Sequence, residues 1–143
     1  MIRRDDNGAM VFSACRFIER CNGALEAETL VCVEGIALAF HWTMLPFEVE
    51  TDWLTLTHML QSREKDLSAS AHLVREIRRL IDGDREISVR KIHHAQNQVS
   101  HSLANKAWSE VLNEFWLEGG CIVGNMVMNR HILIQNVKAI IMA

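Results

Sequence analysis

Hydrophobic and polar positions in the first third of the chain predict a long helix followed by a short strand. From Asn22 onward, apolar or small residues recur at spacings of three, four and seven, which is typical of one helix face. That face comprises Ala24, Ala27, Val31, Gly35, Leu38 and Trp42. Pro46 ends the helix, and the alternating segment from Phe47 to Asp52 predicts a strand. The rest of the chain is organised around this helix and strand.

The segment before this helix predicts half of a hairpin. Asp6-Asn7-Gly8 is a strong turn signal, and the residues from Ala9 to Phe17 follow it as a strand. The partner strand upstream of the turn runs only from Met1 to Arg4, which is short for a strand. Either the hairpin is stunted or the domain lacks its natural beginning, and we favour the second alternative.

Downstream of Asp52 the pattern alternates between helical and extended periods. The predicted elements are a helix over Trp53–Ser62, a helix over Ala69–Asp82, a strand over Glu86–Ile92, a loop over His93–Asn97 and a helix from Gln98 to about Leu117. This order of strands and helices indicates an α/β domain with a mixed sheet. From Glu118 the chain is apolar and irregular in period. We assign residues 1–117 to the domain. For residues 118–143 we prefer a tail outside its core, and the alternative is a last strand or helix of the domain.

Composition narrows the class of protein without identifying it. A chain of 143 residues with 49% hydrophobic and 23% charged residues is typical of one globular domain. The longest apolar runs are shorter than a membrane span, so we expect no membrane partner. The four cysteines form no CxxC pair, which favours reduced thiols in an intracellular protein of unknown compartment. A net charge of -3 gives no overall attraction to nucleic acid, so any such attraction must be local.

Two acidic residues are candidates for a cation site. Glu28 lies at the edge of the apolar helix face, where a carboxylate needs a compensating positive charge. Asp52 lies at the carboxyl end of a predicted strand, the edge at which α/β sheets bind ligands. Two converging carboxylates indicate a divalent cation. The alternative, that Glu28 is solvated and Asp52 caps a helix, stays open.

A cluster of basic residues is a candidate nucleic-acid interface. It comprises Arg75, Arg78, Arg79, Arg85, Arg90 and Lys91. Phosphate binding needs such local positive charge, although ion pairs on a solvated helix face would explain the cluster equally well. His93 and His94 follow it in a predicted loop, where a histidine near the site could carry a proton or be incidental.

Four short motifs occur in the order Arg4–Gly8, Leu25–Glu28 together with Glu34–Ala39, Val49–Asp52 and Asn97–Ala104. In this order they resemble the ribonuclease H-like domain, and most of all its plant, reverse-transcriptase-derived branch. The resemblance covers residues 1–117. It implies a sheet of five strands in the order 3-2-1-4-5, flanked by helices. It also implies cleavage of the RNA strand of RNA–DNA hybrids with two Mg²⁺ ions, or Mn²⁺ in their place.

The resemblance assigns roles to particular residues. Glu28 and Asp52 match two acidic positions and are expected to hold metal, while His101 occupies the last acidic position of the family. Glu28, Asp52 and His101 are therefore the expected catalytic residues. We expect nucleic-acid contacts from the basic residues and one loop histidine, namely Arg75, Arg78, Arg79, Arg90, Lys91 and His94.

The family's first strand, which carries the Asp of an Asp-x-Gly motif, would precede Met1. Because that strand is central in the order 3-2-1-4-5, its loss leaves unpaired backbone beside the first hairpin. We expect the segment from Ile132 to Val137, or a partner chain, to fill the gap. The resulting function is a hybrid ribonuclease with impaired turnover. The alternatives are a non-catalytic binding domain or a retroelement-derived fragment without a selected function.

Overall fold

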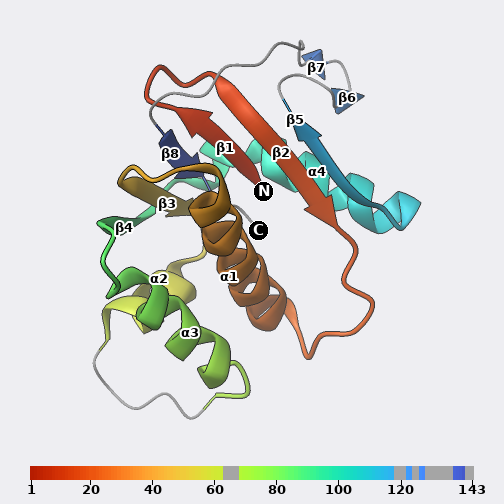
Figure 1. The fold of residues 1–143 in the computed structure, drawn as a ribbon. Helices are drawn as coiled ribbons and strands as arrows, with labels where there is room; N and C mark the ends of the chain where they lie inside the picture. The colour runs from red at the N-terminus through yellow and green to blue at the C-terminus, as the bar shows by residue number, and fades with distance from the viewer. Residues whose placement is uncertain (63–67, 118–121, 124–125, 128–136, 141–143) are drawn as a thin grey trace.

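The computed structural model describes residues 1–62, 68–117, 122–123, 126–127 and 137–140 as a mixed α/β structure, which confirms the predicted fold class (Figure 1). Its elements in chain order are β1 Ile2–Asp5, β2 Met10–Arg16, α1 Ala24–Trp42, β3 Phe47–Thr51, α2 Leu54–Gln61, α3 Ala71–Ile81, β4 Ile87–Lys91, the 3-10 turn η1 His94–Gln96, α4 Gln98–Glu110, β5 Asn113–Leu117, β6 Ile122–Val123, β7 Met126–Val127 and β8 Val137–Ile140. In the described part of the chain, each helix is too short or too polar to cross a bilayer.

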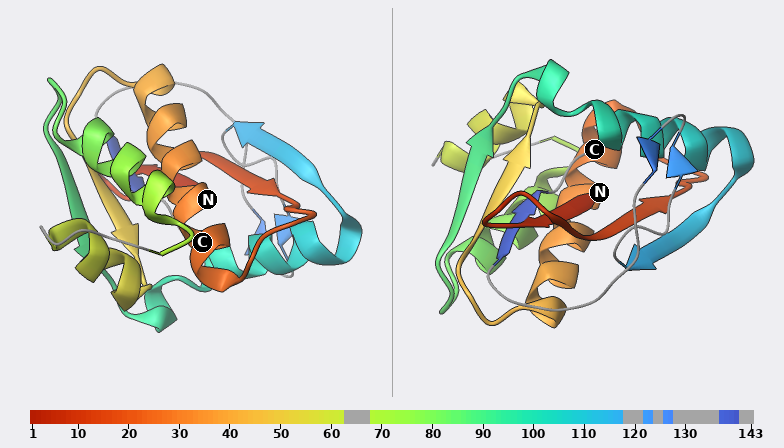
Figure 2. Two further views of the ribbon diagram at one scale, coloured as in Figure 1. Left: turned by 90° about the horizontal axis from the view of Figure 1, so that it is seen from below. Right: turned by 90° about the horizontal axis from the view of Figure 1, so that it is seen from above.

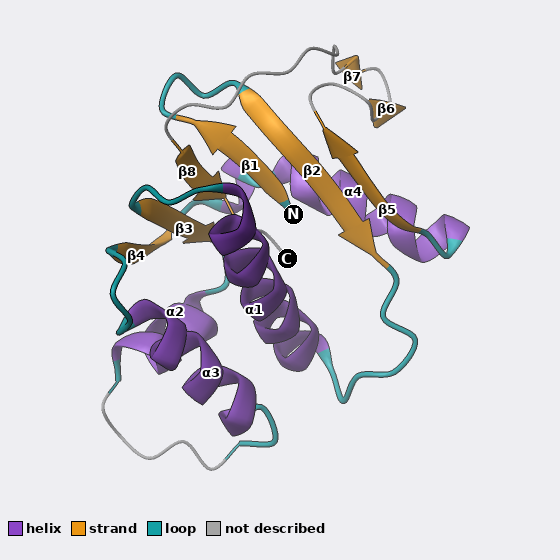
Figure 3. Cartoon of the chain, viewed as in Figure 1, coloured by secondary structure: helices purple, strands orange, loops and turns teal. Residues whose placement is uncertain are grey.

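The described strands form a four-stranded antiparallel sheet, a parallel pair and a short antiparallel pair of β6 with β7 (Figure 3). The larger sheet has the order β5-β2-β1-β8, with antiparallel pairing throughout. β3 and β4 pair in parallel, with Thr51 opposite Lys91. β8 pairs with β1, with Ile2 opposite Ile140, and it also contacts β3. The backbone of β8 therefore lies beside β1, where the sequence predicts a gap.

Most of the C-terminal segment lies outside the described residues. This holds for residues 132–136 of the predicted gap-filling segment. The boundary at residue 117 between domain and tail also stays a prediction.

α1 and α4 pack on opposite faces of the hairpin formed by β1 and β2 (Figure 2). On one face, Leu103 and Ala107 of α4 contact Ile2 and Cys15. On the other face, the ring of Trp42 lies 6.0 Å from that of Phe12. Successive side chains of a strand point to opposite faces, so each strand contributes to both packing layers.

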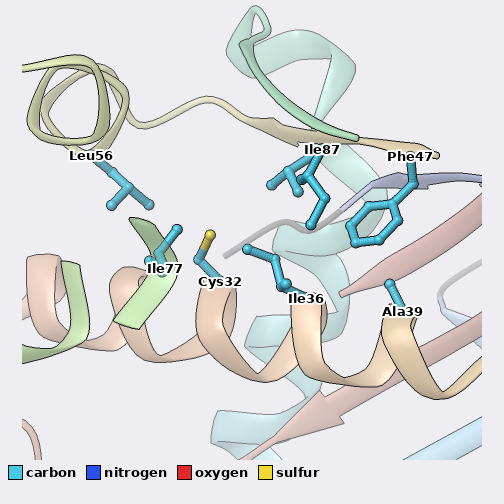
Figure 4. Close-up of a cluster of buried hydrophobic side chains, with 8 residues drawn as sticks. Cys32, Ile36, Ala39, Phe47, Leu56, Ile77 and Ile87 are labelled. Carbon is cyan, nitrogen blue, oxygen red and sulfur yellow. The ribbon is translucent and has the colours of Figure 1, made fainter. Parts of the chain in front are cut away.

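The main core lies between α1 and the parallel pair β3 and β4 (Figure 4). Cys32, Ile36 and Ala39 of α1 are buried there against Phe47 and Ile87. Leu56 of α2 and Ile77 of α3 close the same cluster. The apolar spacing predicts a different face of α1 from the one that is buried most deeply. On the predicted face, Ala24 is exposed, and Val31 and Leu38 are only half-buried.

The predicted helix from Gln98 to Leu117 is wrong in its last third. α4 ends at Glu110, and Val111 takes a left-handed conformation with φ 53° that closes the helix. The chain then returns as β5, which pairs with β2 so that Phe12 faces Leu117. The apolar residues after Glu110 satisfy a strand period as well as a helical one, so only the neighbouring β2 decides between them.

Candidate functional site

Asp52 directly follows β3, and the parallel pairing of β3 with β4 decides which residues surround it. The two strands end together, because Thr51 faces Lys91 and the Ile92 amide donates to the Thr51 carbonyl over 2.9 Å. The residues that follow β4 therefore lie beside Asp52. This is the edge of a parallel sheet at which ligand sites form.

The 3-10 turn η1 brings the first histidine to Asp52. His93 caps the turn in both directions: its Nδ1 accepts from the Ala95 amide over 3.2 Å, and its own amide donates to Gln96 Oε1 over 2.9 Å. The turn fixed in this way places His94 Nδ1 2.7 Å from Asp52 Oδ2. The side chain of His94 is 72% exposed, so it lies at the mouth of the site.

The first turn of α4 supplies two further partners. The Asn97 carbonyl accepts from the His101 amide, while its buried side-chain amide donates to Asp52 Oδ1 over 2.6 Å. One helical turn later, His101 Nε2 lies 3.1 Å from Asp52 Oδ2. The rings of His94 and His101 are 4.2 Å apart between centroids. Asn97 thus holds one carboxylate oxygen, and the two imidazoles share the other.

The environment of Asp52 keeps its carboxylate ionised. Burial acts to raise the pKa of Asp52, but hydrogen bonds from Asn97, His94 and His101 outweigh that effect and hold the pKa below its usual value. The alternative that Asp52 caps α2 is wrong, because the N-cap residue of α2 is Trp53 and no side chain caps that helix.

Glu28 lies on α1 beside the same site and is not a solvated residue. Its Oε2 is buried without a hydrogen-bond partner among the described residues. Burial, and then the negative charge of Asp52, raise the pKa of Glu28 to about 7. Glu28 and Asp52 line one pocket of about 380 Å³ with His94, His101, Trp53 and Thr55. The two predicted metal ligands and the third predicted catalytic residue therefore meet in one place.

The structure adds roles that the sequence did not predict. The sequence predicts nucleic-acid binding or proton transfer for His94, and the structure places its Nδ1 2.7 Å from Asp52 Oδ2. Asn97 belongs to one of the motifs of the resemblance, which gives its side chain no role, and its amide orients the Asp52 carboxylate. An Asn directly before a helix signals a cap, and nothing in the sequence shows that its side chain reaches a distant carboxylate instead.

Two of the three basic residues of α3, Arg78 and Arg79, contact other groups of the protein. The Arg78 guanidinium donates to the Ser62 carbonyl over 2.5 Å and to the Met59 carbonyl, so it binds the C-terminal end of α2. Arg79 forms an exposed ion pair with Glu76 over 2.7 Å. Arg75 on the same helix is exposed. The nucleic-acid role of these three residues stays a prediction.

The two basic residues of β4 differ from one another. Arg90 forms ion pairs with Glu48 over 2.9 Å and with Glu50 of the neighbouring strand. Lys91 is exposed at the end of β4, beside Thr51 and hence next to Asp52. Of these two cations, Lys91 is better placed to meet a phosphate at the edge that carries the pocket.

The donor atoms of the pocket fit one divalent cation better than a pair of Mg²⁺ ions. The unpartnered carboxylate oxygen of Glu28 and the ionised Asp52 both favour a cation. A pair of Mg²⁺ ions requires many oxygen ligands, whereas the described pocket offers two carboxylates and two imidazoles. Imidazole nitrogen suits zinc or manganese better than magnesium.

Comparison with known proteins identifies the family of the chain. A family model described as reverse transcriptase-like matches residues 1–107, a range that contains Glu28, Asp52, His94, Asn97 and His101. Neither a curated protein nor a solved structure matches the chain.

Proposed function

Because the chain belongs to the reverse transcriptase-like family of ribonuclease H-like domains, we propose that it binds RNA–DNA hybrids and hydrolyses their RNA strand slowly in the presence of a divalent cation. The observation that carries this proposal is the convergence of Glu28, Asp52 and His101 on one pocket at the end of β3.

The residues of the pocket supply negative charge at the place where a scissile phosphate would approach. Ionised Asp52 is already fixed by Asn97, so it is positioned before a cation arrives. A divalent cation at such a site supplies water activation and stabilises developing charge on phosphate oxygens. We expect slow turnover because the described pocket offers two carboxylates, which are few oxygen ligands for divalent cations that act on a phosphate.

The proposal is tested by cleavage of a labelled RNA–DNA hybrid with Mg²⁺ and with Mn²⁺. We expect cleavage that requires the added cation, and we expect Asp52→Asn to abolish it. The matched control is Asp82→Asn, because Asp82 is an exposed carboxylate at the end of α3. Each protein is first shown to melt cooperatively. Equal cleavage by wild type and Asp52→Asn would show that another site, or a contaminant, cuts the hybrid.

A second candidate function is hybrid binding without cleavage. The observation that favours it is the imidazole of His101 at a position where the resemblance implies a carboxylate, which leaves fewer oxygen ligands for the ions. A cooperatively folded chain that binds hybrid and leaves it intact with both cations would establish this function instead.

Hybrid binding itself is expected to depend on Lys91. Lys91→Ala removes an exposed positive charge beside the pocket, so we expect about threefold to tenfold weaker hybrid binding. The slope of the logarithm of the binding constant against the logarithm of the salt concentration is expected to decrease by about one. Binding is measured by fluorescence anisotropy at several salt concentrations.

The matched control for this experiment is Arg79→Ala. Arg79 is also exposed, but Glu76 already compensates its charge over 2.7 Å, so a smaller loss of affinity is expected. A larger loss of hybrid affinity in Arg79→Ala than in Lys91→Ala would show that the hybrid binds at α3 and not at the end of β4.

A further inference from the structure

We propose that Asp52, His94 and His101 bind a single transition-metal ion, with Zn²⁺ as the representative ion, more tightly than Mg²⁺. This inference deepens the proposed function by naming the ion that occupies its pocket. Metal binding is measured without nucleic acid, so its result tests this proposal independently of hybrid cleavage.

The first observation is the convergence of three donor atoms. One donor atom each of Asp52, His94 and His101 lies within 4.8 Å of the other two. His94 Nδ1 and His101 Nε2 are already 2.7 Å and 3.1 Å from Asp52 Oδ2. Tetrahedral Zn²⁺ holds its ligands at roughly 2.0–2.2 Å, which sets neighbouring ligand atoms about 3.4 Å apart. Small side-chain movements therefore suffice, and the exposed imidazole of His94 has room to make them.

The second observation is the chemistry of the donor set. A neutral imidazole carries its one hydrogen on either ring nitrogen, so His94 and His101 can each turn a lone pair toward an ion without losing a proton overall. Two imidazoles and one carboxylate neutralise half of a doubly charged ion and provide mostly nitrogen ligands. That set suits Zn²⁺, Co²⁺ or Ni²⁺, whereas Mg²⁺ prefers oxygen ligands in an octahedral arrangement.

The third observation is that the surrounding residues hold the ligands in place. The buried amide of Asn97 fixes Asp52 Oδ1 over 2.6 Å, and His93 caps the turn that carries His94. Metal sites are commonly stabilised by such outer hydrogen bonds, which orient the ligands before the ion binds. The three ligands thus belong to a preorganised site.

The fourth observation is the unpartnered oxygen of Glu28 in the same pocket. In the part of the chain that the structure describes, its Oε2 is buried without a hydrogen-bond partner, and a buried polar atom of this kind requires a compensating group. A cation held by Asp52, His94 and His101 provides positive charge in the pocket that Glu28 lines. The remaining coordination position is then open to water or to a phosphate oxygen.

The test uses the full chain after treatment with a chelator. Isothermal titration calorimetry measures the binding of Zn²⁺ alone and of Mg²⁺ alone. We expect one Zn²⁺ per chain and an affinity at least about 100-fold higher for Zn²⁺ than for Mg²⁺. His94→Ala and His101→Ala are each expected to weaken Zn²⁺ binding at least about tenfold. His94 is exposed, so its replacement is expected to leave the fold intact, and a thermal melt checks this.

Two control variants separate this site from other zinc ligands. His72→Ala removes an exposed imidazole of α3 that lies outside the cluster, and Cys21→Ser removes an exposed thiol. Both are expected to bind Zn²⁺ like the wild type, and bound Co²⁺ is expected to show no thiolate charge-transfer absorption. Zn²⁺ binding no tighter than Mg²⁺ binding would overturn the proposal, as would binding that survives His94→Ala or disappears in Cys21→Ser. If the chain binds Zn²⁺ through His94 but does not cut hybrid, the proposed metal site is supported and the proposed nuclease function is wrong.

Discussion

Replacement of Leu56 by alanine is expected to lower the free energy of unfolding by about 2–4 kcal/mol. Leu56 of α2 is 1% exposed and contacts the main core formed by α1, β3 and α3. The substitution removes buried apolar surface and leaves a cavity that the packed neighbours refill only in part, so both effects destabilise the folded state. The loss is measured by urea denaturation.

Leu54→Ala is the matched control for this experiment. Leu54 lies on the same helix, two positions earlier, and its side chain is 49% exposed. The two variants share the same change in helix propensity, and we expect Leu54→Ala to lower stability by less than about 1 kcal/mol. Equal losses in the two variants would show that α2 does not present Leu56 to the core.

The same pair of leucines shows what the sequence left undecided. The pattern predicts a helix after Asp52, but it offers two apolar faces, one with Leu54 and Thr57 and the other with Leu56 and Leu60. The structure buries Leu56 and Thr57 most deeply, and these residues belong to different predicted faces. In a helix of eight residues the choice of face depends on the partners, here α1 and α3, rather than on local spacing.

For α1, the sequence predicts the helix itself but not which of its faces is buried. The sequence predicts a helix that begins near Asn22 and ends before Pro46, and α1 runs from Ala24 to Trp42. Its buried face did not follow, because apolar side chains occur all around this helix. Such a helix packs on several sides, and the sequence alone cannot rank them.

The C-terminal end of α4 shows a related limit. Apolar residues after Glu110 continue the helical period, yet Asn113–Leu117 forms β5 against β2. The turn is made by Val111 with φ 53°, a conformation that a β-branched residue rarely adopts. Where Gly or Asn is absent, the usual sequence signal for a helix end is missing.

The candidate site was partly predictable. The position of Asp52 at the end of a strand indicated the ligand-binding edge, and the resemblance added Glu28 and His101. The contacts of His94 and Asn97 with Asp52 were not predictable from spacing, because they depend on the parallel pairing of β3 with β4 and on the cap of η1. The tertiary structure thus gives Asp52 its three side-chain partners, His94, Asn97 and His101.

The second large effect is expected from Glu28→Gln, which should stabilise the metal-free chain by roughly 2–3 kcal/mol at pH 8. In the folded chain, burial and Asp52 raise the pKa of Glu28 to about 7, whereas the unfolded chain titrates near the ordinary value of 4.5. Between these two pH values the folded state holds a proton that the unfolded state has lost. The free energy of unfolding contributed by Glu28 therefore falls as the pH rises from 4.5 to 7 and stays low above it.

Glutamine resembles the protonated carboxyl in shape and carries no charge at any pH, so the gain from Glu28→Gln should vanish below about pH 4.5. The measurement is urea denaturation from pH 4 to 8 with a chelator present, and Glu19→Gln at an exposed glutamate is the control. A variant as stable as the wild type at pH 8 would show that Glu28 ionises without a penalty. We also expect Glu28→Gln to abolish metal-dependent cleavage, because the same buried charge that weakens the fold is the one that favours a cation. Stability gained at pH 8 together with cleavage lost would identify Glu28 as a residue retained for the site at the expense of the fold.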